Sequence, residues 1–138
     1  MGDAMQRLFS HVDLRVKDVA PSTEFYDVLL AEFGFVRVKG LFPDDEPTWR
    51  RERWKANDEF IGLTVDPKFI PNANRIAFHA TSREQVDRAT AALWKAGARD
   101  IDGPQDYSGY YATFCEDLAG NKLEVCFLTH HRFVEGQP

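Results

Sequence analysis

The chain has 138 residues and a formal net charge of −5, with a pI near 5.3. Its length suits one domain, or two small halves that share a core. The acidic balance argues against a general nucleic-acid binder, and no apolar run is long enough to span a membrane. Hydrophobic residues make up 43% and charged residues 28% of the chain, as in ordinary soluble globular proteins. Because the N-terminus lacks the apolar core of a signal peptide, we expect a cytoplasmic protein.

The first half has the pattern of a strand, a helix and three further strands. Polar and apolar residues alternate over 8–16, which predicts a strand with His11 and Arg15 on one face. A four-residue apolar repeat over 21–33 predicts a helix that Gly34 ends. The strands expected after this helix cover 35–39, 48–55 and 59–65.

The second half repeats this order of elements. Residues 67–74 hold two prolines and two asparagines and are expected to form a linker. After a strand at 75–80, the capping sequence TSRE at 81–84 opens a helix that Gly97 ends. The strands expected next cover 98–101, 110–115 and 122–127. An internal duplication explains the repeat, with a first module (1–66), the linker, a second module (75–128) and a C-terminal tail (129–138).

The last two expected strands place a carboxylate among apolar residues. Strand alternation puts Glu124 on one face with Lys122 and Cys126, while its apolar neighbours point to the other face. A carboxylate inside a strand is costly unless it is paired, metal-bound or solvated, and the sequence alone leaves these options open. Cys115 and Cys126 both fall inside expected strands, so we expect buried thiols rather than a disulfide framework.

The order of these elements resembles the vicinal oxygen chelate superfamily, which includes glyoxalases, bleomycin-resistance proteins and extradiol dioxygenases. The motifs that carry the resemblance are HVDLRVKD at 11–18, FY at 25–26, FGF at 33–35, IAF at 76–78 and DLAGNKLE at 117–124. The last motif departs from the usual Asp-Pro-x-Gly-Asn turn, since Leu118 replaces the proline. The resemblance implies an α+β fold of two paired βαβββ modules. Their strands form a curled mixed sheet, a cup or half-barrel, with the helices on its outer face. It also implies a homodimer, because dimerisation often completes the cup.

Metal-using members of this superfamily hold a divalent ion between the first and last strands of each module. The resemblance places two of these ligands on His11 and Glu124 and the other two positions on Gly62 and Arg75, which cannot bind a metal. His79 shares the face of Arg75 and is the first candidate for a replacement ligand. The resemblance thus leaves two options, a divalent iron, manganese, nickel or zinc ion held by His11, Glu124 and His79, or no metal.

The same alignment predicts a cup lined by arginine and aromatic side chains. Arg75 stands where a metal ligand is expected, so its guanidinium could pair with Glu124 in place of the ion. Strand parity places either Arg51 and Arg53, or Arg50, toward the cup. The expected substrate-binding residues are Arg75, Arg15, Trp49, Arg51 and Tyr110. The alternative is that these arginines form ordinary surface ion pairs.

Two functions follow from the resemblance. The first is a metal-dependent lyase or dioxygenase of the glyoxalase kind with a degenerate ligand set, in which Glu124 is catalytic. The second is a metal-free protein of the bleomycin-resistance kind that binds or sequesters its ligand. In both, the expected partner is a small polar or anionic molecule, bound through charge-assisted hydrogen bonds and stacking.

Overall fold

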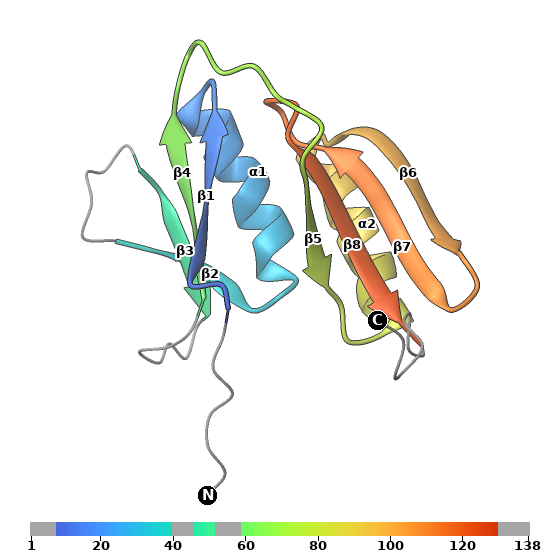
Figure 1. Cartoon of the computed structure of the whole chain (residues 1–138). Helices are drawn as coiled ribbons and strands as arrows, with labels where there is room; N and C mark the ends of the chain where they lie inside the picture. Colours follow the sequence, from blue (N-terminus) through green and yellow to red (C-terminus); the bar gives the residue numbers. More distant parts are fainter. Residues whose placement is uncertain (1–7, 40–45, 52–58, 130–138) are drawn as a thin grey trace, which may run out of the picture.

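The computed structural model describes residues 8–39, 46–51 and 59–129, and these form two four-stranded sheets and two helices (Figure 1). The elements of the first half are β1 (His11–Val16), α1 (Val19–Ala31), β2 (Phe35–Val38), β3 (Thr48–Arg51) and β4 (Phe60–Val65). Those of the second half are β5 (Arg75–His79), α2 (Arg83–Ala96), β6 (Arg99–Asp106), β7 (Tyr110–Glu116) and β8 (Lys122–Leu128). The predicted βαβββ order of elements is therefore confirmed in both halves. Neither helix in these ranges is long and apolar enough to cross a membrane.

The two halves share one strand topology. The strand orders are β1-β4-β3-β2 and β5-β8-β7-β6. In each half the first strand runs parallel to the last, and the other pairs are antiparallel. The expected mixed sheet is thus present as two separate four-stranded sheets, with β1 and β5 as their adjacent inner edges (Figure 1).

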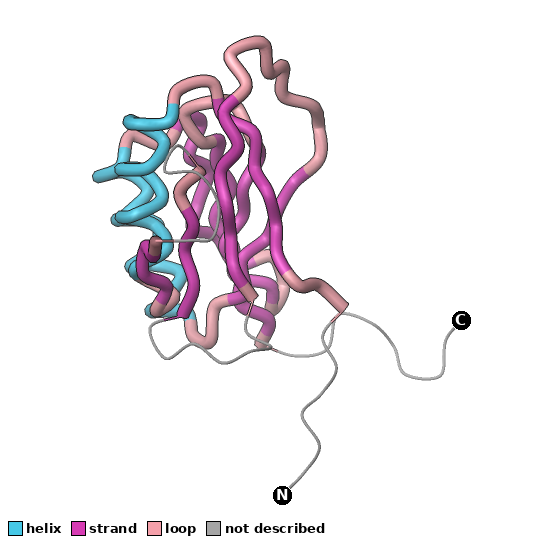
Figure 2. Tube along the Cα trace, turned by 90° about the vertical axis from the view of Figure 1, so that its left-hand side faces the viewer, coloured by secondary structure: helices cyan, strands magenta, loops and turns pink. Residues whose placement is uncertain are grey.

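Both helices cover the same side of the strands (Figure 2). Helix α2 begins at a capping serine, Ser82, whose side chain accepts a hydrogen bond from the Gln85 amide at 3.0 Å. The cap lies one residue later than the predicted Thr81. The helix ends at Gly97, which has a φ of 85°. Helix α1 has no side-chain cap, so burial of its apolar face holds it in place.

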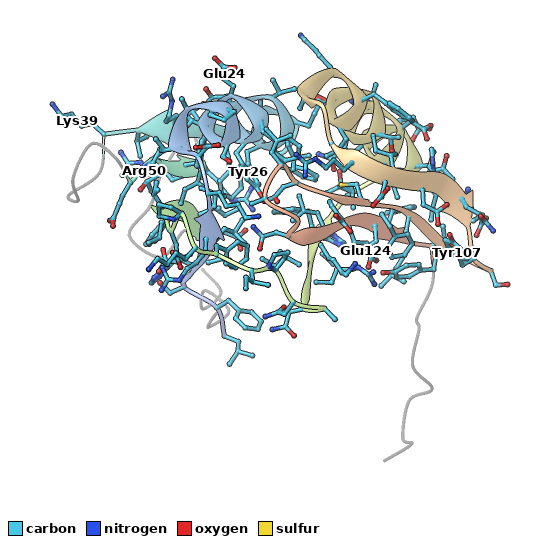
Figure 3. All side chains as sticks on the ribbon, turned by 90° about the horizontal axis from the view of Figure 1, so that it is seen from above. Glu24, Tyr26, Lys39, Arg50, Tyr107 and Glu124 are labelled. Atoms are coloured by element: carbon cyan, nitrogen blue, oxygen red, sulfur yellow. The ribbon has the colours of Figure 1, made fainter. Side chains whose placement is uncertain are left out.

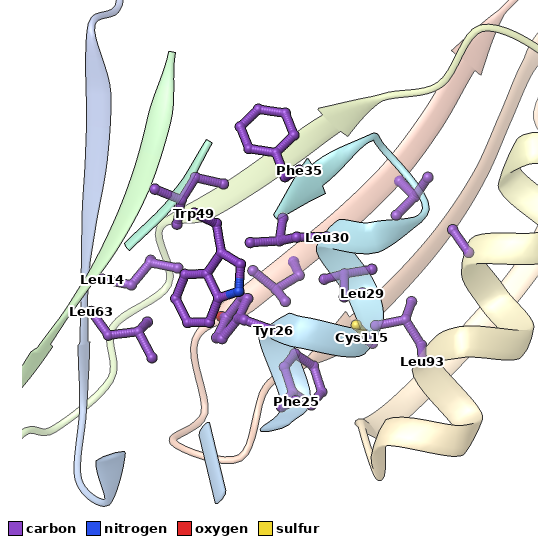
Figure 4. Packing of buried hydrophobic residues seen from close by; sticks show 14 of the residues in the cluster. Leu14, Phe25, Tyr26, Leu29, Leu30, Phe35, Trp49, Leu63, Leu93 and Cys115 are labelled. Atoms are coloured by element: carbon purple, nitrogen blue, oxygen red, sulfur yellow. The ribbon is translucent and has the colours of Figure 1, made fainter. Parts of the chain in front are cut away.

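One hydrophobic core spans the two halves (Figure 4). Trp49 from β3, Leu29 from α1 and Leu93 from α2 all belong to it and are almost fully buried. A buried hydrogen bond also crosses between the halves, from the Tyr26 hydroxyl to Asp117 Oδ2 at 2.6 Å. The two modules therefore pack as one body through their helix layer.

Several boundaries differ from the sequence prediction, most of all in β1 and β6. Strand β1 begins at His11 rather than at residue 8, and β6 is longer than the predicted 98–101. Sequence reasoning ended β6 early because Gly103 and Pro104 rarely occur inside strands, and the pairing with β7 does shift register there. The end of the strand predicted at 48–55, and the tail beyond residue 129, lie outside the described residues.

Candidate functional site: a cleft between the two sheets

A cleft of about 600 Å³ lies between the inner edges of the two sheets. It is bounded by β1 and β4 on one side, by β5 on the other, and by the ends of the helices at its base. Its aromatic lining is Phe9, Phe33, Phe35, Phe60 and Phe78, and its charged or titratable lining is His11, Arg51, Glu59, Arg75 and His79. The base is thus apolar and the rim polar, as in small-molecule sites.

The imidazole of His11 is fixed on three sides at this rim. Its ring stacks on Phe60, with 4.3 Å between centroids and 5° between planes. Nε2 lies 3.5 Å from Asp13 Oδ2, and Nδ1 lies 3.0 Å from Ser10 Oγ. The residue predicted as a metal ligand therefore already has neighbours for both ring nitrogens.

Gly62 provides the space for this arrangement. It is the register partner of Asp13, and a Cβ added at residue 62 would lie 3.1 Å from Asp13 Oδ1. The alignment identified Gly62 only as an empty ligand position. The structure adds that the Asp13 side chain lies over Gly62 and contacts His11. Sequence reasoning missed this role of Asp13, although Asp13 shares a strand face with His11.

Glu124 lies on the second sheet, on the side of β8 away from α2 (Figure 3). It is 6% exposed and accepts a hydrogen bond from the Tyr110 hydroxyl. Tyr110 lies on β7, and the only side chain between it and Phe114 on that face is the small Ala112. The predicted carboxylate and phenol are thus in contact with each other.

Arg75 adopts a different position from the one predicted. Its guanidinium carbon lies 5.0 Å from the centroid of the Phe114 ring, the register partner of Glu124. Within the described ranges Arg75 makes no ion pair, so the expected Arg75–Glu124 pair is not formed. Its charge remains available at the rim of the cleft.

Trp49 does not lie on the open face of the sheet, so its predicted place in the cup is wrong. It is fully buried and its Nε1 donates to Asp27 Oδ1 at 2.8 Å, because strand parity turns it toward α1. Arg51 shares that parity and reaches the cleft from the strand end, where it pairs with Glu59 at 3.1 Å. Arg50 instead shares the open face with its register partner Phe60.

Arg15 is exposed on the open face of β1, and its carbonyl accepts a hydrogen bond from Asn121 Nδ2 at 2.8 Å. Arg53, the other arginine considered for the cup, lies outside the described residues.

The expected metal ligands do not form one cluster. In the described part of the chain, no group of three or more His, Cys, Asp or Glu side chains could hold an ion. His11 belongs to the first sheet, Glu124 is engaged by Tyr110 on the second, and His79 is the register partner of Cys126. These residues do not fit a metal within one chain.

Two shifted pKa values belong to the core rather than to the cleft. Burial, followed by the nearby Asp117 carboxylate, raises the pKa of Tyr26 well above its ordinary value. Burial and the negative charges of Asp117 and Glu116 raise the pKa of Cys115 from 9.0 to about 12. Cys115 is therefore a buried thiol, as predicted, whereas Cys126, also expected to be buried, is only half-buried.

The comparisons with known proteins agree with this architecture. The profile of the Glyoxalase/Bleomycin resistance protein/Dioxygenase superfamily matches residues 8–125, so the chain belongs to that superfamily. The chain is also 29% identical over 127 residues to the uncharacterized protein YqjT of Bacillus subtilis (strain 168), an alignment covering 83% of this chain and 94% of that protein.

Solved structures show the same fold. A glyoxalase/bleomycin resistance protein from Albidiferax ferrireducens T118 superposes with a TM-score of 0.69 at 26% identity, covering 88% of this chain and 98% of that one. The fosfomycin resistance protein FosX of Listeria monocytogenes, solved with Mn(II) and sulfate, gives a TM-score of 0.63 at 18% identity and covers 85% of this chain and 86% of that one. At that identity the second likeness concerns the fold alone.

Proposed function

We propose that this protein binds a small aromatic anion in the cleft between β1 and β5. The observation that carries the proposal is Arg75, a guanidinium without an ion-pair partner among the described residues, at the rim of a cleft lined by phenylalanines. A planar guanidinium forms paired hydrogen bonds with a carboxylate or phosphate, and the aromatic base accepts a flat ring. Binding of this kind corresponds to the bleomycin-resistance branch of the superfamily and needs no metal.

The test is the affinity of the purified protein for 2-naphthoate and for its neutral analogue 2-naphthamide, measured by isothermal titration calorimetry. We expect 2-naphthoate to bind more tightly. Arg75→Gln should weaken the binding of 2-naphthoate about tenfold or more, which corresponds to about 1.4 kcal/mol, and should leave 2-naphthamide almost unchanged.

Arg99→Gln is the matched control, because it removes the same charge from β6, at the far edge of the same sheet. Equal losses in the two variants would show a general charge effect and contradict the proposal. Equal affinity for the two ligands would contradict it as well.

A metal-dependent lyase or dioxygenase is the second candidate. The contact of His11 with Asp13 at 3.5 Å favours this candidate, because it places two side chains that can donate electron pairs to a metal on one strand. The Mn(II) in the Listeria FosX structure also favours it. Because these donors and Glu124 lie on different sheets, the described residues of one chain do not complete a ligand set, and we propose that groups from a second copy of the chain complete it. We therefore propose a homodimer for this case, measurable by light scattering.

Elemental analysis before and after chelation and reloading with iron, manganese, nickel and zinc separates the two functions. About one ion per chain, lost in His11→Ala and in Glu124→Gln, would support the metal-dependent enzyme. Unchanged naphthoate binding after chelation would support the metal-free binding protein.

A further inference from the structure

We propose that the ligand of this cleft is an arylalkanoate, in which a chain of methylene groups separates the carboxylate from the aromatic ring. The inference rests on the proposed function and refines its ligand class. It also assigns a role to Ala77, whose small side chain leaves space for the methylene chain between Arg75 and the aromatic base of the cleft.

The cleft passes through the gap between β1 and β5 and is not confined to one face of a sheet. Both faces of β1 line it, His11 from the open face and Val12 and Leu14 from the helix side. All five residues of β5 (Arg75–His79) line it as well. Because successive residues of a strand point to opposite faces, the cleft reaches from the open face of the strands to the helix layer.

Charge and aromatic rings occupy opposite ends of the cleft. Helix α1 ends and α2 begins beside the end of β5 (Figure 1), and these helix ends form the base. Phe33, just past the end of α1, and Phe78, near the end of β5, contribute to the aromatic lining there. Arg75 is the first residue of β5 and His79 the last, a separation of about 13 Å at the rise of an extended strand. A ligand that contacts both ends therefore needs a spacer between its carboxylate and its ring.

The helix side of β5 has apolar surface that the chain leaves uncovered. Ile76 and Phe78 are only half-buried, whereas their register partners on β8, Leu123 and Val125, are both 1% exposed. The difference arises because β5 borders the cleft and β8 does not. A methylene chain lying along β5 would remove this surface from water and gain hydrophobic free energy in proportion to the area covered.

Ala77 leaves the space that such a chain needs. It lies between Arg75 and His79 on the open face of β5, lines the cleft and is exposed. Its register partner, Glu124, is nearly buried and accepts the hydrogen bond from Tyr110, so it does not extend over the alanine's exposed side. A large side chain at residue 77 would fill the space between the charged end and the aromatic end.

Arg75 is the group that binds the carboxylate. Among the described residues that line the cleft, the other arginine is Arg51, which pairs with Glu59 at 3.1 Å. The Arg75 guanidinium lies over the Phe114 ring, 5.0 Å from its centroid. It can therefore form paired hydrogen bonds with a carboxylate without breaking an ion pair in the described part of the chain.

The experiment measures the affinity of the full chain for phenylacetate, 4-phenylbutanoate, 6-phenylhexanoate and 8-phenyloctanoate by isothermal titration calorimetry, at ligand concentrations too low for micelles. We expect the affinity to rise up to about fourfold for each added methylene group and to level off once the ring reaches the base. Ala77→Phe should remove this gain, so that 8-phenyloctanoate binds about as weakly as phenylacetate. Arg75→Gln should weaken the binding of every member about tenfold or more.

Val36→Phe is the matched control for Ala77→Phe. Val36 is an exposed residue on β2, at the outer edge of the first sheet, and does not line the cleft. The control should keep the rise in affinity seen with the wild-type protein. Circular dichroism establishes that each variant is folded, and the wild-type series tests the ligand class even if Ala77→Phe does not fold.

The outcomes separate this inference from the proposed function. An affinity that does not change with chain length, while Arg75→Gln still weakens binding, would overturn the arylalkanoate and leave the proposed function intact. A rise with chain length that persists in Ala77→Phe, or that Val36→Phe removes equally, would overturn the role of Ala77. If Arg75→Gln weakens the binding of neither 2-naphthoate nor any phenylalkanoate, both proposals are wrong.

Discussion

Single residues on the open face of the second sheet form pairs that replace the interactions predicted from the sequence. Glu124, expected to meet a metal or Arg75, accepts a hydrogen bond from Tyr110. Arg75, expected to meet Glu124, covers the ring of Phe114. A nearly buried carboxylate needs such a donor, because its negative charge is poorly solvated.

Tyr110→Phe should therefore destabilise the protein. Removing a hydrogen bond to a charged, buried group costs about 1.5–3 kcal/mol, and urea unfolding followed by circular dichroism measures it. Tyr107→Phe, at the exposed end of the same hairpin, is the control and should cost much less. If both variants lose the same stability, the hydroxyl of Tyr110 has no special role.

Cys115 makes stability depend on pH. In the unfolded chain the Cys115 thiol loses its proton from about pH 9, whereas in the folded state it keeps this proton until about pH 12. The folded state thus binds more protons in this window, and the free energy of unfolding should fall as the pH rises through it.

Urea unfolding at pH 8, 9 and 10 should show this decline, and the decline should flatten in Cys115→Ala. Cys126→Ser should keep the wild-type slope, because its thiol lies on the other face of the sheet. If neither substitution changes how steeply the free energy of unfolding falls with pH, Cys115 is not the group responsible for the fall.

The most constrained element is the turn between β7 and β8. Its Asp117 is buried and accepts hydrogen bonds from the backbone amides of Ala119 and Asn121, as well as from the Tyr26 hydroxyl. Asn121 in turn donates to the carbonyl of Arg15. The last of the motifs that carry the family resemblance is therefore a turn that also connects β8 to the first module through hydrogen bonds.

Gly120→Ala should be more harmful than Gly34→Ala. Both glycines have positive φ, 92° and 77°, so each substitution costs about 1–2 kcal/mol in the backbone. A Cβ at residue 120 would also lie 2.8 Å from Pro71 Cγ, while a Cβ at residue 34 would meet nothing within 4 Å. We expect a further loss of about 1 kcal/mol or more for Gly120→Ala, measured by thermal and urea unfolding, and equal losses would show that Pro71 moves aside freely.

For the whole molecule, the shared core predicts that the two modules unfold together. Leu93 lies in α2 of the second module and Trp49 in β3 of the first, yet both belong to one cluster. Leu93→Ala should cost about 2–5 kcal/mol. Tryptophan fluorescence and circular dichroism should shift together along the urea axis. Separate transitions for the two probes would indicate modules that fold on their own.

Element order was predictable from the sequence because strand alternation, the α2 apolar face and the glycines at helix ends are local signals. The site was less predictable, because it depends on which face each strand presents. Trp49 is followed by arginines, and no neighbouring residue in the sequence indicates that its register partner on β4 is the buried Ile61. Likewise, the pairing of Asp13 with Gly62 arises only from the parallel register of β1 and β4.

The separation of the two sheets has a mechanical consequence. No backbone hydrogen bonds join β1 to β5 in the described structure, so the width of the cleft is set by helix packing and by contacts such as the stacked rings of Phe33 and Phe78, 5.7 Å apart. Side chains can repack over much lower barriers than those for breaking a strand ladder. We therefore expect the cleft to widen or narrow more easily than either sheet can change its own register.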